Sequence, residues 1–316
     1  MLAHAEDAAQ TALRPEIQSF IREMAAEHGF DQARLTEQFA RIRRRDDIIA
    51  LITRPAERTK PWHEYRAIFL DRQRIENGAA FWREHATTLA RAEQTYGVPP
   101  EIVTAIIGVE TRYGRVTGRD GVLEALTTLA FDYPRRADFF RRELEEYLLL
   151  TREEGIDPLS LLGSYAGAMG IAQFMPSSYR AYAVDFDDDG LRDLWHNPVD
   201  AIGSAASYLG EHGWRAGAPV VAAAEVSGSA WRAQLDQGME PRLTVAEWRA
   251  LGVRPEVPVD DARRAILLEL EGADGPIYRL GFHNFYVITR YNRSPLYAMA
   301  VFELAQAIRA RRVAGS

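Results

Sequence analysis

The chain has 316 residues, a formal net charge of −7, 47% hydrophobic residues and no cysteine. This composition is typical of a soluble globular protein with about two domains. The negative charge argues against a nucleic-acid partner, which would require a basic face. The lack of cysteine excludes disulfides, thiolate metal sites and a cysteine nucleophile. No apolar run approaches the roughly 18 residues of a membrane span.

The N-terminal part is expected to be helical from about residue 15 to residue 54, because its apolar side chains recur at helical spacing. These side chains are Ile17, Phe20, Ile21 and Met24, followed by Leu35, Phe39 and Ile42. Further along, Trp62, Phe69 and Trp82 are interpreted as core residues. Tyr65 is interpreted in the same way, unless a cleft lies beside it.

A buried helix is expected to begin at Pro99-Pro100, since proline suits the first helical turn, and to end in a left-handed cap at Gly114. Glu110 interrupts its apolar pattern, and its carboxylate shares a face with three apolar side chains. Those side chains are Val103, Ile106 and Ile107. Burial disfavours the charged form of a carboxyl group and raises its pKa, as a general acid at neutral pH requires.

From this helix alone, a purely structural role for Glu110 remains equally open. Its carboxylate could form an ion pair with Arg112 or Arg115, and ion pairs also shift carboxyl pKa values.

The segment Ser164–Gly170 is rich in small residues, which allow a neighbouring helix or a ligand to approach the backbone closely. Soon after it, Asp185, Asp187, Asp189 and Gly190 have the spacing of the first half of a calcium loop. The twelfth loop position, where an acid is standard, is His196. Asp200 is the nearest carboxylate downstream, so the loop is longer than usual. A solvated acidic run is the alternative to a Ca²⁺ site.

The composition changes between residues 216 and 275, where short apolar stretches alternate with Gly, Pro and Asp. The alternation in AILLELEG predicts a strand, so this region is expected to be a small insert that contains strands. A last helix is expected after Ser294 and Pro295. Its apolar stripe consists of Tyr297, Ala300, Val301, Leu304 and Ile308.

Four separated motifs resemble, in the same order, those of one known family. The motifs are ETRYG at Glu110, SYAGAMGIAQFMPSSY from Ser164, DFDDDGLRDLW from Asp185 and NFYVITRYN from Asn284. They resemble the membrane-bound lytic transglycosylase B family, the family 103 glycoside hydrolases that cut bacterial peptidoglycan. The resemblance extends from about Pro15 to Ala310.

The resemblance implies a mainly α fold of the α+β class, with a lysozyme-like helical core, an N-terminal helical domain and a small inserted β domain. We expect the helical domain at residues 1–79, the core at 80–215 and 276–316, and the β domain at 216–275. The EF-hand-like loop would occupy residues 185–200. One extra residue, His196 or Asn197, precedes Pro198 in this chain.

The resemblance also assigns roles to individual residues. Glu110 matches the single catalytic acid/base. The positions that match the lining of the glycan groove are Ser164, Gln173, Tyr208, Tyr291, Asn292, Tyr297 and Tyr65. The candidate Ca²⁺ ligands are Asp185, Asp187, Asp189, the Leu191 carbonyl and Asp200. The calcium would be structural and is not required for the chemistry.

The implied activity is cleavage of the β-1,4 bond between N-acetylmuramic acid and N-acetylglucosamine, with formation of 1,6-anhydro ends. Three alternatives stay open: a lysozyme-like hydrolase, a non-catalytic glycan- or calcium-binding protein of the same fold, and a cytoplasmic helical scaffold. The expected partners are peptidoglycan glycan strands and other cell-wall enzymes, and the expected state is a monomer. The first ten residues lack the apolar core of a signal peptide, so either the protein is cytoplasmic or a leader has been removed. The implied substrate favours the periplasm.

Overall fold

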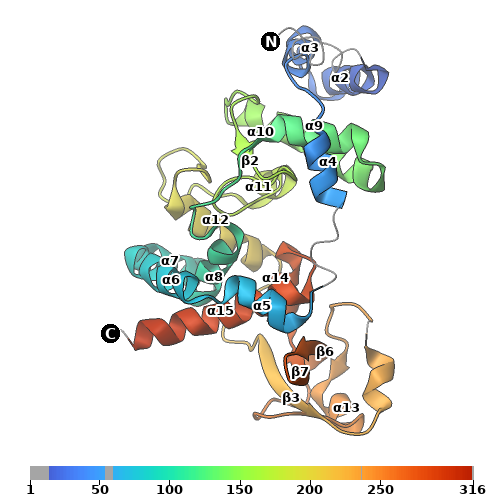
Figure 1. The fold of residues 1–316 in the computed structure, drawn as a ribbon. Coiled ribbons are helices and arrows are strands. Elements are labelled where there is room, and N and C mark those ends of the chain that lie inside the picture. The colour runs from blue at the N-terminus through green and yellow to red at the C-terminus, as the bar shows by residue number, and fades with distance from the viewer. Residues whose placement is uncertain (1–13, 54–59, 236, 315–316) are drawn as a thin grey trace.

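The computed structural model describes residues 14–53, 60–235 and 237–314. The N-terminal residues that lack a signal-peptide pattern lie outside these ranges. The described chain is mainly helical and has a five-stranded sheet at one end and a separate two-stranded sheet elsewhere, which agrees with the expected α+β class (Figure 1). No described helix is both long and apolar enough to cross a membrane.

The helices of the first half are α2 (Pro15–His28), α3 (Gln32–Phe39), α4 (Asp46–Thr53), α5 (Trp62–Phe69), α6 (Arg72–Glu84), α7 (Ala86–Tyr96), α8 (Pro100–Thr111), α9 (Val122–Asp132) and α10 (Ala137–Glu153). Those of the second half are α11 (Pro176–Tyr182), α12 (Pro198–Glu211), α13 (Val245–Ala250), α14 (His283–Tyr291) and α15 (Pro295–Val313). The 3₁₀ helices are η1 (Pro134–Arg136) and η2 (Ala230–Gln234). The strands are β1 (Asp120–Gly121), β2 (Leu162–Gly163), β3 (Val221–Val226), β4 (Leu243–Thr244), β5 (Val253–Pro255), β6 (Arg264–Gly272) and β7 (Gly275–Gly281).

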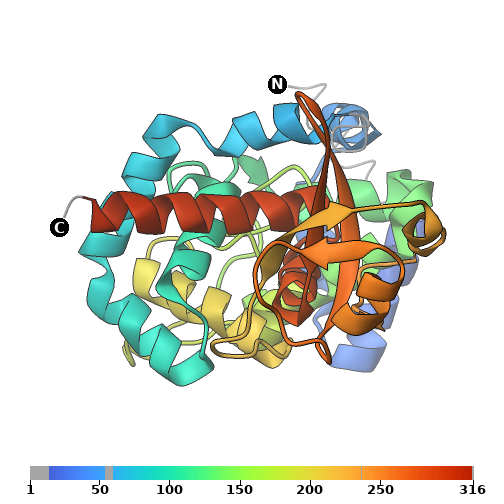
Figure 2. The same cartoon turned by 90° about the horizontal axis from the view of Figure 1, so that it is seen from below.

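The first six helices divide into two groups that pack against different parts of the chain. Helix α4 packs against α9, and Arg14, just before α2, pairs with Asp132 at the end of α9 at 2.9 Å. Helices α5 and α6 instead pack against α15, and α7 packs against α12 (Figures 1 and 2). Helix α6 also runs through the predicted boundary at residue 79. The N-terminal segment therefore covers two sides of the molecule.

Helix α8 lies at the centre of this arrangement and contacts α6, α7, α12 and α15. Every residue from Ile102 to Gly108 is buried, as its continuous apolar sequence predicts. The stripe of α15 is also buried, and Ser294 caps that helix by accepting a hydrogen bond from the Tyr297 backbone N–H at 3.3 Å. The two helices that carry Glu110 and Tyr297 thus pack directly on each other.

The sheet has the strand order β4-β6-β7-β3-β5 among the described residues, with every neighbouring pair antiparallel. The strand predicted from AILLELEG is confirmed as part of β6. Because side chains alternate along a strand, Ile266 and Leu268 join the main core, while Ala265 and Leu267 join a second cluster with Trp248. Strand β7 belongs to the same sheet, so the sheet extends past the predicted boundary at residue 275 to Gly281.

Candidate active site

Glu110 lies in the last turn of α8, one residue before the helix ends, and its side chain is half-buried. The expected helix end at Gly114 was wrong. The left-handed cap is Arg112, with φ 51°, and Tyr113 and Gly114 continue in the same region at φ 63° and 80°. Left-handed conformations are uncommon for residues with a side chain, so this turn must be held by its surroundings.

Several hydrogen bonds hold this turn. The N–H of Arg112 bonds to the Gly108 carbonyl at 3.2 Å, and the N–H of Tyr113 bonds to the Ile107 carbonyl at 3.3 Å. The Tyr113 hydroxyl donates to the Arg74 carbonyl of α6 at 2.8 Å. Glu110 is therefore presented from a fixed helix end instead of a flexible loop.

The phenol of Tyr297 donates a hydrogen bond to Oε1 of Glu110 at 2.5 Å. Tyr297 is 3% exposed and lies in the first turn of α15. Burial, together with the nearby charge of Glu110, raises the pKa of Tyr297 well above 10. The phenol therefore keeps its proton and remains a donor to Glu110 at neutral pH.

Other tyrosines surround this pair. The Tyr291 hydroxyl donates to the Ala172 carbonyl at 2.7 Å, and burial followed by the charge of Glu110 raises the pKa of Tyr291 well above 10. Tyr208 packs against Tyr291 with ring centroids 4.8 Å apart, and burial raises the pKa of Tyr208 to about 12. Tyr65 is buried and lies near enough to Tyr297 to contribute to the raised pKa of the Tyr297 phenol. The four predicted tyrosines thus lie in one group, in which Tyr291 and Tyr297 are near enough to Glu110 for its charge to raise their pKa values.

Gln173 is fixed beside this group in a strained backbone conformation with φ 52°. Its side-chain amide donates to the carbonyls of Thr117 and Gly170 at 3.0 and 2.9 Å. The next residue, Phe174, packs against Tyr208 and Tyr291 with ring centroids 5.6 and 5.8 Å apart. Gln173 therefore joins the loop after Glu110 to the tyrosine cluster.

Ser164 and Asn292 make hydrogen bonds within their own loops. The Ser164 hydroxyl accepts a hydrogen bond from the Ala168 N–H at 3.0 Å, which closes the small-residue turn next to β2. Asn292 is half-buried and follows α14, and its carbonyl accepts from the Ser294 N–H at 2.7 Å. These hydrogen bonds shape the two loops, and the predicted roles of both residues toward a glycan stay predictions.

The acidic loop forms a second cluster of carboxylates. Oxygens of Asp185, Asp187 and Asp200 lie within 4.8 Å of one another, and Asp200 is fully buried at the start of α12. Burial and the charges of the other two carboxylates raise the pKa of Asp200, although it also accepts hydrogen bonds from the N–H groups of Phe186 and Asp193. Carboxylates gathered in this way repel one another unless a cation lies between them.

Two of the predicted ligands lie outside this cluster of three carboxylates. Asp189 accepts a hydrogen bond from the Leu191 N–H at 2.9 Å, and the Leu191 side chain is 60% exposed. The extra residue before Pro198 is accommodated without displacing Asp200. Asn197 caps α12 and also donates to Asp187 at 2.9 Å, while the His196 side chain projects into solvent.

Sequence reasoning missed the role of Asn197 in supporting Asp187. It also missed the way the loop is attached to the core, where the guanidinium of Arg91 on α7 stacks over the Phe186 ring 3.9 Å from its centroid. The only sequence signal for the role of Asn197 was its position directly before a proline, which is a common start of a helix.

Comparisons with known proteins place the chain in a family. The model of the transglycosylase SLT domain matches residues 12–306. The membrane-bound lytic murein transglycosylase B of Escherichia coli strain K12 is 46% identical over 311 residues, which is 96% of this chain and 85% of that protein. The chain belongs to this family of lytic transglycosylases.

Solved structures of relatives share the fold. The catenated lytic transglycosylase SltB1 of Pseudomonas aeruginosa is 52% identical, with a TM-score of 0.91 over 95% of this chain and 98% of that chain. The E. coli lytic transglycosylase Slt35 in complex with calcium is 46% identical, with a TM-score of 0.87 over 95% and 94%. SltB3 of P. aeruginosa in complex with NAG-anhNAM-pentapeptide is 32% identical, with a TM-score of 0.82 over 93% and 79%. The fold is therefore lysozyme-like, and the protein is a peptidoglycan lytic transglycosylase.

Proposed function

We propose that Glu110 is the single general acid/base of this transglycosylase. The observation that carries the proposal is the geometry of its carboxylate, which is half-buried at a fixed helix end and bonded by the phenol of Tyr297 at 2.5 Å. The other acid of α8, Glu101, lies in the first turn and pairs with Arg309 at 3.4 Å. It is too far along the helix to act with Glu110 as a second catalytic carboxylate.

A single carboxyl group is sufficient if the substrate supplies the nucleophile. Glu110 gives its proton to the glycosidic oxygen as the bond from that oxygen to the anomeric carbon of N-acetylmuramic acid breaks. The 2-acetamido group of the sugar stabilises the anomeric carbon. The 6-hydroxyl of the same sugar then forms the new bond to that carbon and returns its proton to Glu110. The product ends in a 1,6-anhydro ring, and Glu110 is regenerated without water being consumed.

The residues around Glu110 have side chains that suit a sugar groove. Tyrosine rings pack against pyranose faces, and amide and hydroxyl groups bond to sugar hydroxyls. We assign this role to Ser164, Gln173, Tyr208, Tyr291, Asn292, Tyr297 and Tyr65. Tyr297 has a second role, since its phenol orients Glu110 toward the scissile bond.

The acidic loop fits a bound Ca²⁺ ion. Hard carboxylate oxygens are the ligands that Ca²⁺ prefers. The buried carboxylate of Asp200 lies within 4.8 Å of the carboxylates of Asp185 and Asp187, and this group of three contains no Lys, Arg or His. We propose that Asp185, Asp187 and Asp200 bind the ion, together with Asp189 and the Leu191 carbonyl after a small movement of the loop. The ion would fix the loop to α12 and would take no part in bond cleavage.

The proposed substrate also indicates where the protein acts. Peptidoglycan lies outside the cytoplasmic membrane, so we propose the periplasm as the site of action and glycan strands as the principal partner. Other enzymes of the cell wall are further proposed partners.

The decisive experiment is mass spectrometry of the soluble products released from purified peptidoglycan. The proposal predicts muropeptides with anhydro ends, each lighter by one water than its hydrolysed counterpart, from the wild type and none from Glu110→Gln. Reducing ends would instead make the protein a lysozyme-like hydrolase.

A further inference from the structure

Thr111 directly follows Glu110 at the end of α8, and its side chain is fully buried. Its hydroxyl accepts a hydrogen bond at 3.0 Å from the N–H of Gly114, in the left-handed turn after the helix. The same hydroxyl donates to the Ile171 carbonyl at 2.8 Å, whereas the Ile107 carbonyl, one turn earlier in α8, lies at 3.2 Å. A hydroxyl has one proton to donate, so the nearer carbonyl is its principal acceptor.

The segment reached by this bond lies 60 residues further along the chain and carries Gln173 of the proposed groove. Tyr291 holds the same segment from another side, through a hydrogen bond from its hydroxyl to the Ala172 carbonyl at 2.7 Å. Among the described residues, Thr111 is the one hydrogen-bond donor to the carbonyl of Ile171, which is itself 5% exposed. A buried carbonyl without a donor is costly, so the segment would have to move if this hydroxyl were removed.

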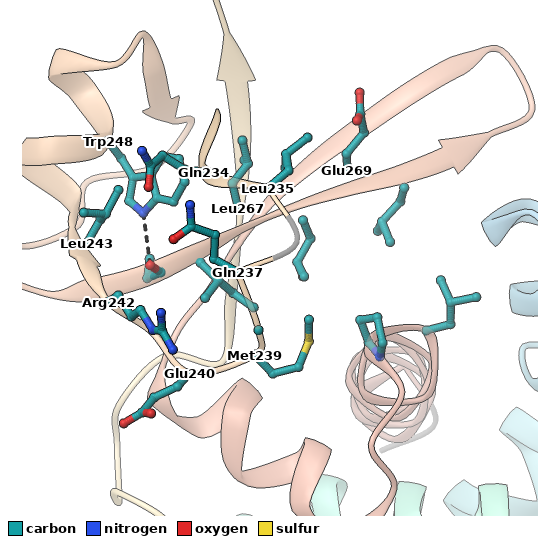
Figure 3. A pocket seen from close by; sticks show the side chains of 17 residues that line it. Gln234, Leu235, Gln237, Met239, Glu240, Arg242, Leu243, Trp248, Leu267 and Glu269 are labelled. Atoms are coloured by element: carbon teal, nitrogen blue, oxygen red, sulfur yellow. Dashed lines mark hydrogen bonds between the residues drawn. The ribbon is translucent and has the colours of Figure 1, made fainter. Parts of the chain in front are cut away.

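The two groups that support the end of α8 lie in different surroundings. The phenol of Tyr297 comes from the first turn of α15, where Pro295 and Leu296 line a cavity of about 210 Å³ beside strand β6 (Figure 3). Thr111 is instead enclosed within the helical core, with no exposed surface. Tyr297 bonds to the carboxylate of Glu110 itself, whereas Thr111 bonds to the two backbone segments on either side of it.

We propose that Thr111 is a positioning residue of this transglycosylase, whose hydroxyl joins the groove segment around Gln173 to the helix end that presents Glu110. The inference rests on the proposed function, since it takes Glu110 as the acid and Gln173 as part of the groove. A sugar held by the groove segment then meets the carboxyl group at a fixed distance. A general acid must lie within hydrogen-bond reach of the oxygen that it protonates, and a misplacement of about 1 Å lowers the rate strongly.

Thr111→Val tests this role, because valine keeps the branched shape of the buried side chain but has no hydroxyl. Thr111→Ser keeps the hydroxyl and is the rescue variant. Thr104→Val is the matched control, since Thr104 is fully buried on the same helix and its hydroxyl donates only within α8, to the Pro100 carbonyl at 2.7 Å. Thr111→Ala removes the same hydroxyl without requiring room for a second methyl group, and it replaces the valine variant if that variant does not fold.

Kinetics on soluble glycan strands, with folding of each variant checked by thermal unfolding, separate positioning from stability. We expect Thr111→Val to lower kcat about tenfold and to change KM by less than about threefold. Thr111→Ser should keep kcat within about threefold of the wild-type value. Thr104→Val should have the wild-type kcat, although it also removes a buried hydroxyl. A wild-type kcat in Thr111→Val, or an equal loss in Thr111→Ser, would overturn the proposal.

Hydrogen exchange measured by mass spectrometry tests the connection between the two segments without relying on catalysis. Thr111→Val should speed exchange about tenfold in the peptides that contain Gly114 and in those that contain Gln173, while Thr104→Val should leave both unchanged. Unchanged exchange of either segment in Thr111→Val would also overturn the proposal. If Glu110→Gln kept the wild-type activity, the proposed chemistry would fail, and the exchange data would still decide whether Thr111 joins the two segments.

Discussion

Two regions of the molecule hold carboxylates in opposite ways. Glu110 is a catalytic candidate at a helix end, and its carboxylate accepts a hydrogen bond from a neutral phenol. In the acidic loop, Asp185, Asp187 and Asp200 lie within 4.8 Å of one another. A carboxyl group bonded by a neutral donor can exchange a proton with a substrate, whereas three adjacent carboxylates require a cation. As we propose, the same functional group therefore serves chemistry in one region and metal binding in the other.

The largest effect should come from removing the carboxyl group of Glu110. Glu110→Gln keeps the shape of the side chain but cannot donate or accept the proton, so we expect transglycosylase activity to fall by about 10³-fold or more. The melting temperature should change little. Glu101→Gln on the same helix is the control and should retain activity. Product release by Glu110→Gln at the wild-type rate would refute the catalytic assignment.

A smaller loss should follow from removing the phenol beside it. Tyr297→Phe deletes the donor to Glu110 but keeps the buried ring, and we expect kcat to fall about tenfold through poorer orientation of the carboxyl group. Tyr286→Phe on α14, whose ring lies near His283, is the matched control. If both variants have the wild-type kcat, the bond between Tyr297 and Glu110 is only structural.

The acidic loop should affect stability and not chemistry. A Ca²⁺ concentration about 100 times its Kd should stabilise the fold by about 2.7 kcal/mol, which raises the melting temperature by roughly 4 °C. Chelation should reverse the shift and leave kcat at 25 °C within about twofold, since the ion takes no part in the proposed cleavage.

Asp187→Asn should abolish most of this shift, because it removes one charge from the cluster. Asp188→Asn is a close control. Asp188 is exposed and lies outside the cluster of three carboxylates. Its backbone is in the left-handed region at φ 61°, a conformation that asparagine tolerates equally well. Differential scanning calorimetry with and without Ca²⁺ measures both variants. Identical behaviour of the two would show that the cluster does not bind the ion.

The smallest effect concerns Glu143, a buried carboxylate in neither region. It accepts hydrogen bonds from the N–H and the hydroxyl of Ser177, at 2.9 and 2.7 Å, but burial still raises its pKa. Folding therefore favours the protonated acid, and its contribution to the free energy of unfolding should decline as the pH rises from 4.5 through the folded pKa. Glu143→Gln does not ionise and should lack this contribution.

Urea unfolding of the wild type and of Glu143→Gln across pH 4–8 measures this effect. The stability of the wild type relative to the variant should decrease as the pH rises. A difference that stays constant or increases with pH would contradict the expected direction. Taken with the first two predictions, this result would separate burial of a carboxyl group from its use in catalysis.

The sequence by itself determined the features that depend on neighbours within a few residues. Helical stripes such as Ile17 to Met24, the cap at Ser294 and the strand in β6 follow from side-chain periodicity and local hydrogen bonding, and all are present. The position of Glu110 on the buried face of its helix was available from the same periodicity. The order of four motifs also indicated the family.

Only the tertiary structure decided which distant groups meet. Tyr297 reaches Glu110 across 187 residues of chain, and Asp200 joins Asp185 and Asp187 despite the extra residue in the loop. The left-handed turn at Arg112 was also missed, because it depends on bonds to Arg74 and to the end of α8. Local patterns reflect contacts over one or two turns of helix, whereas these contacts exist only once the helices have packed. The local sequence could therefore place the carboxylate, and only packing could supply the group that binds it.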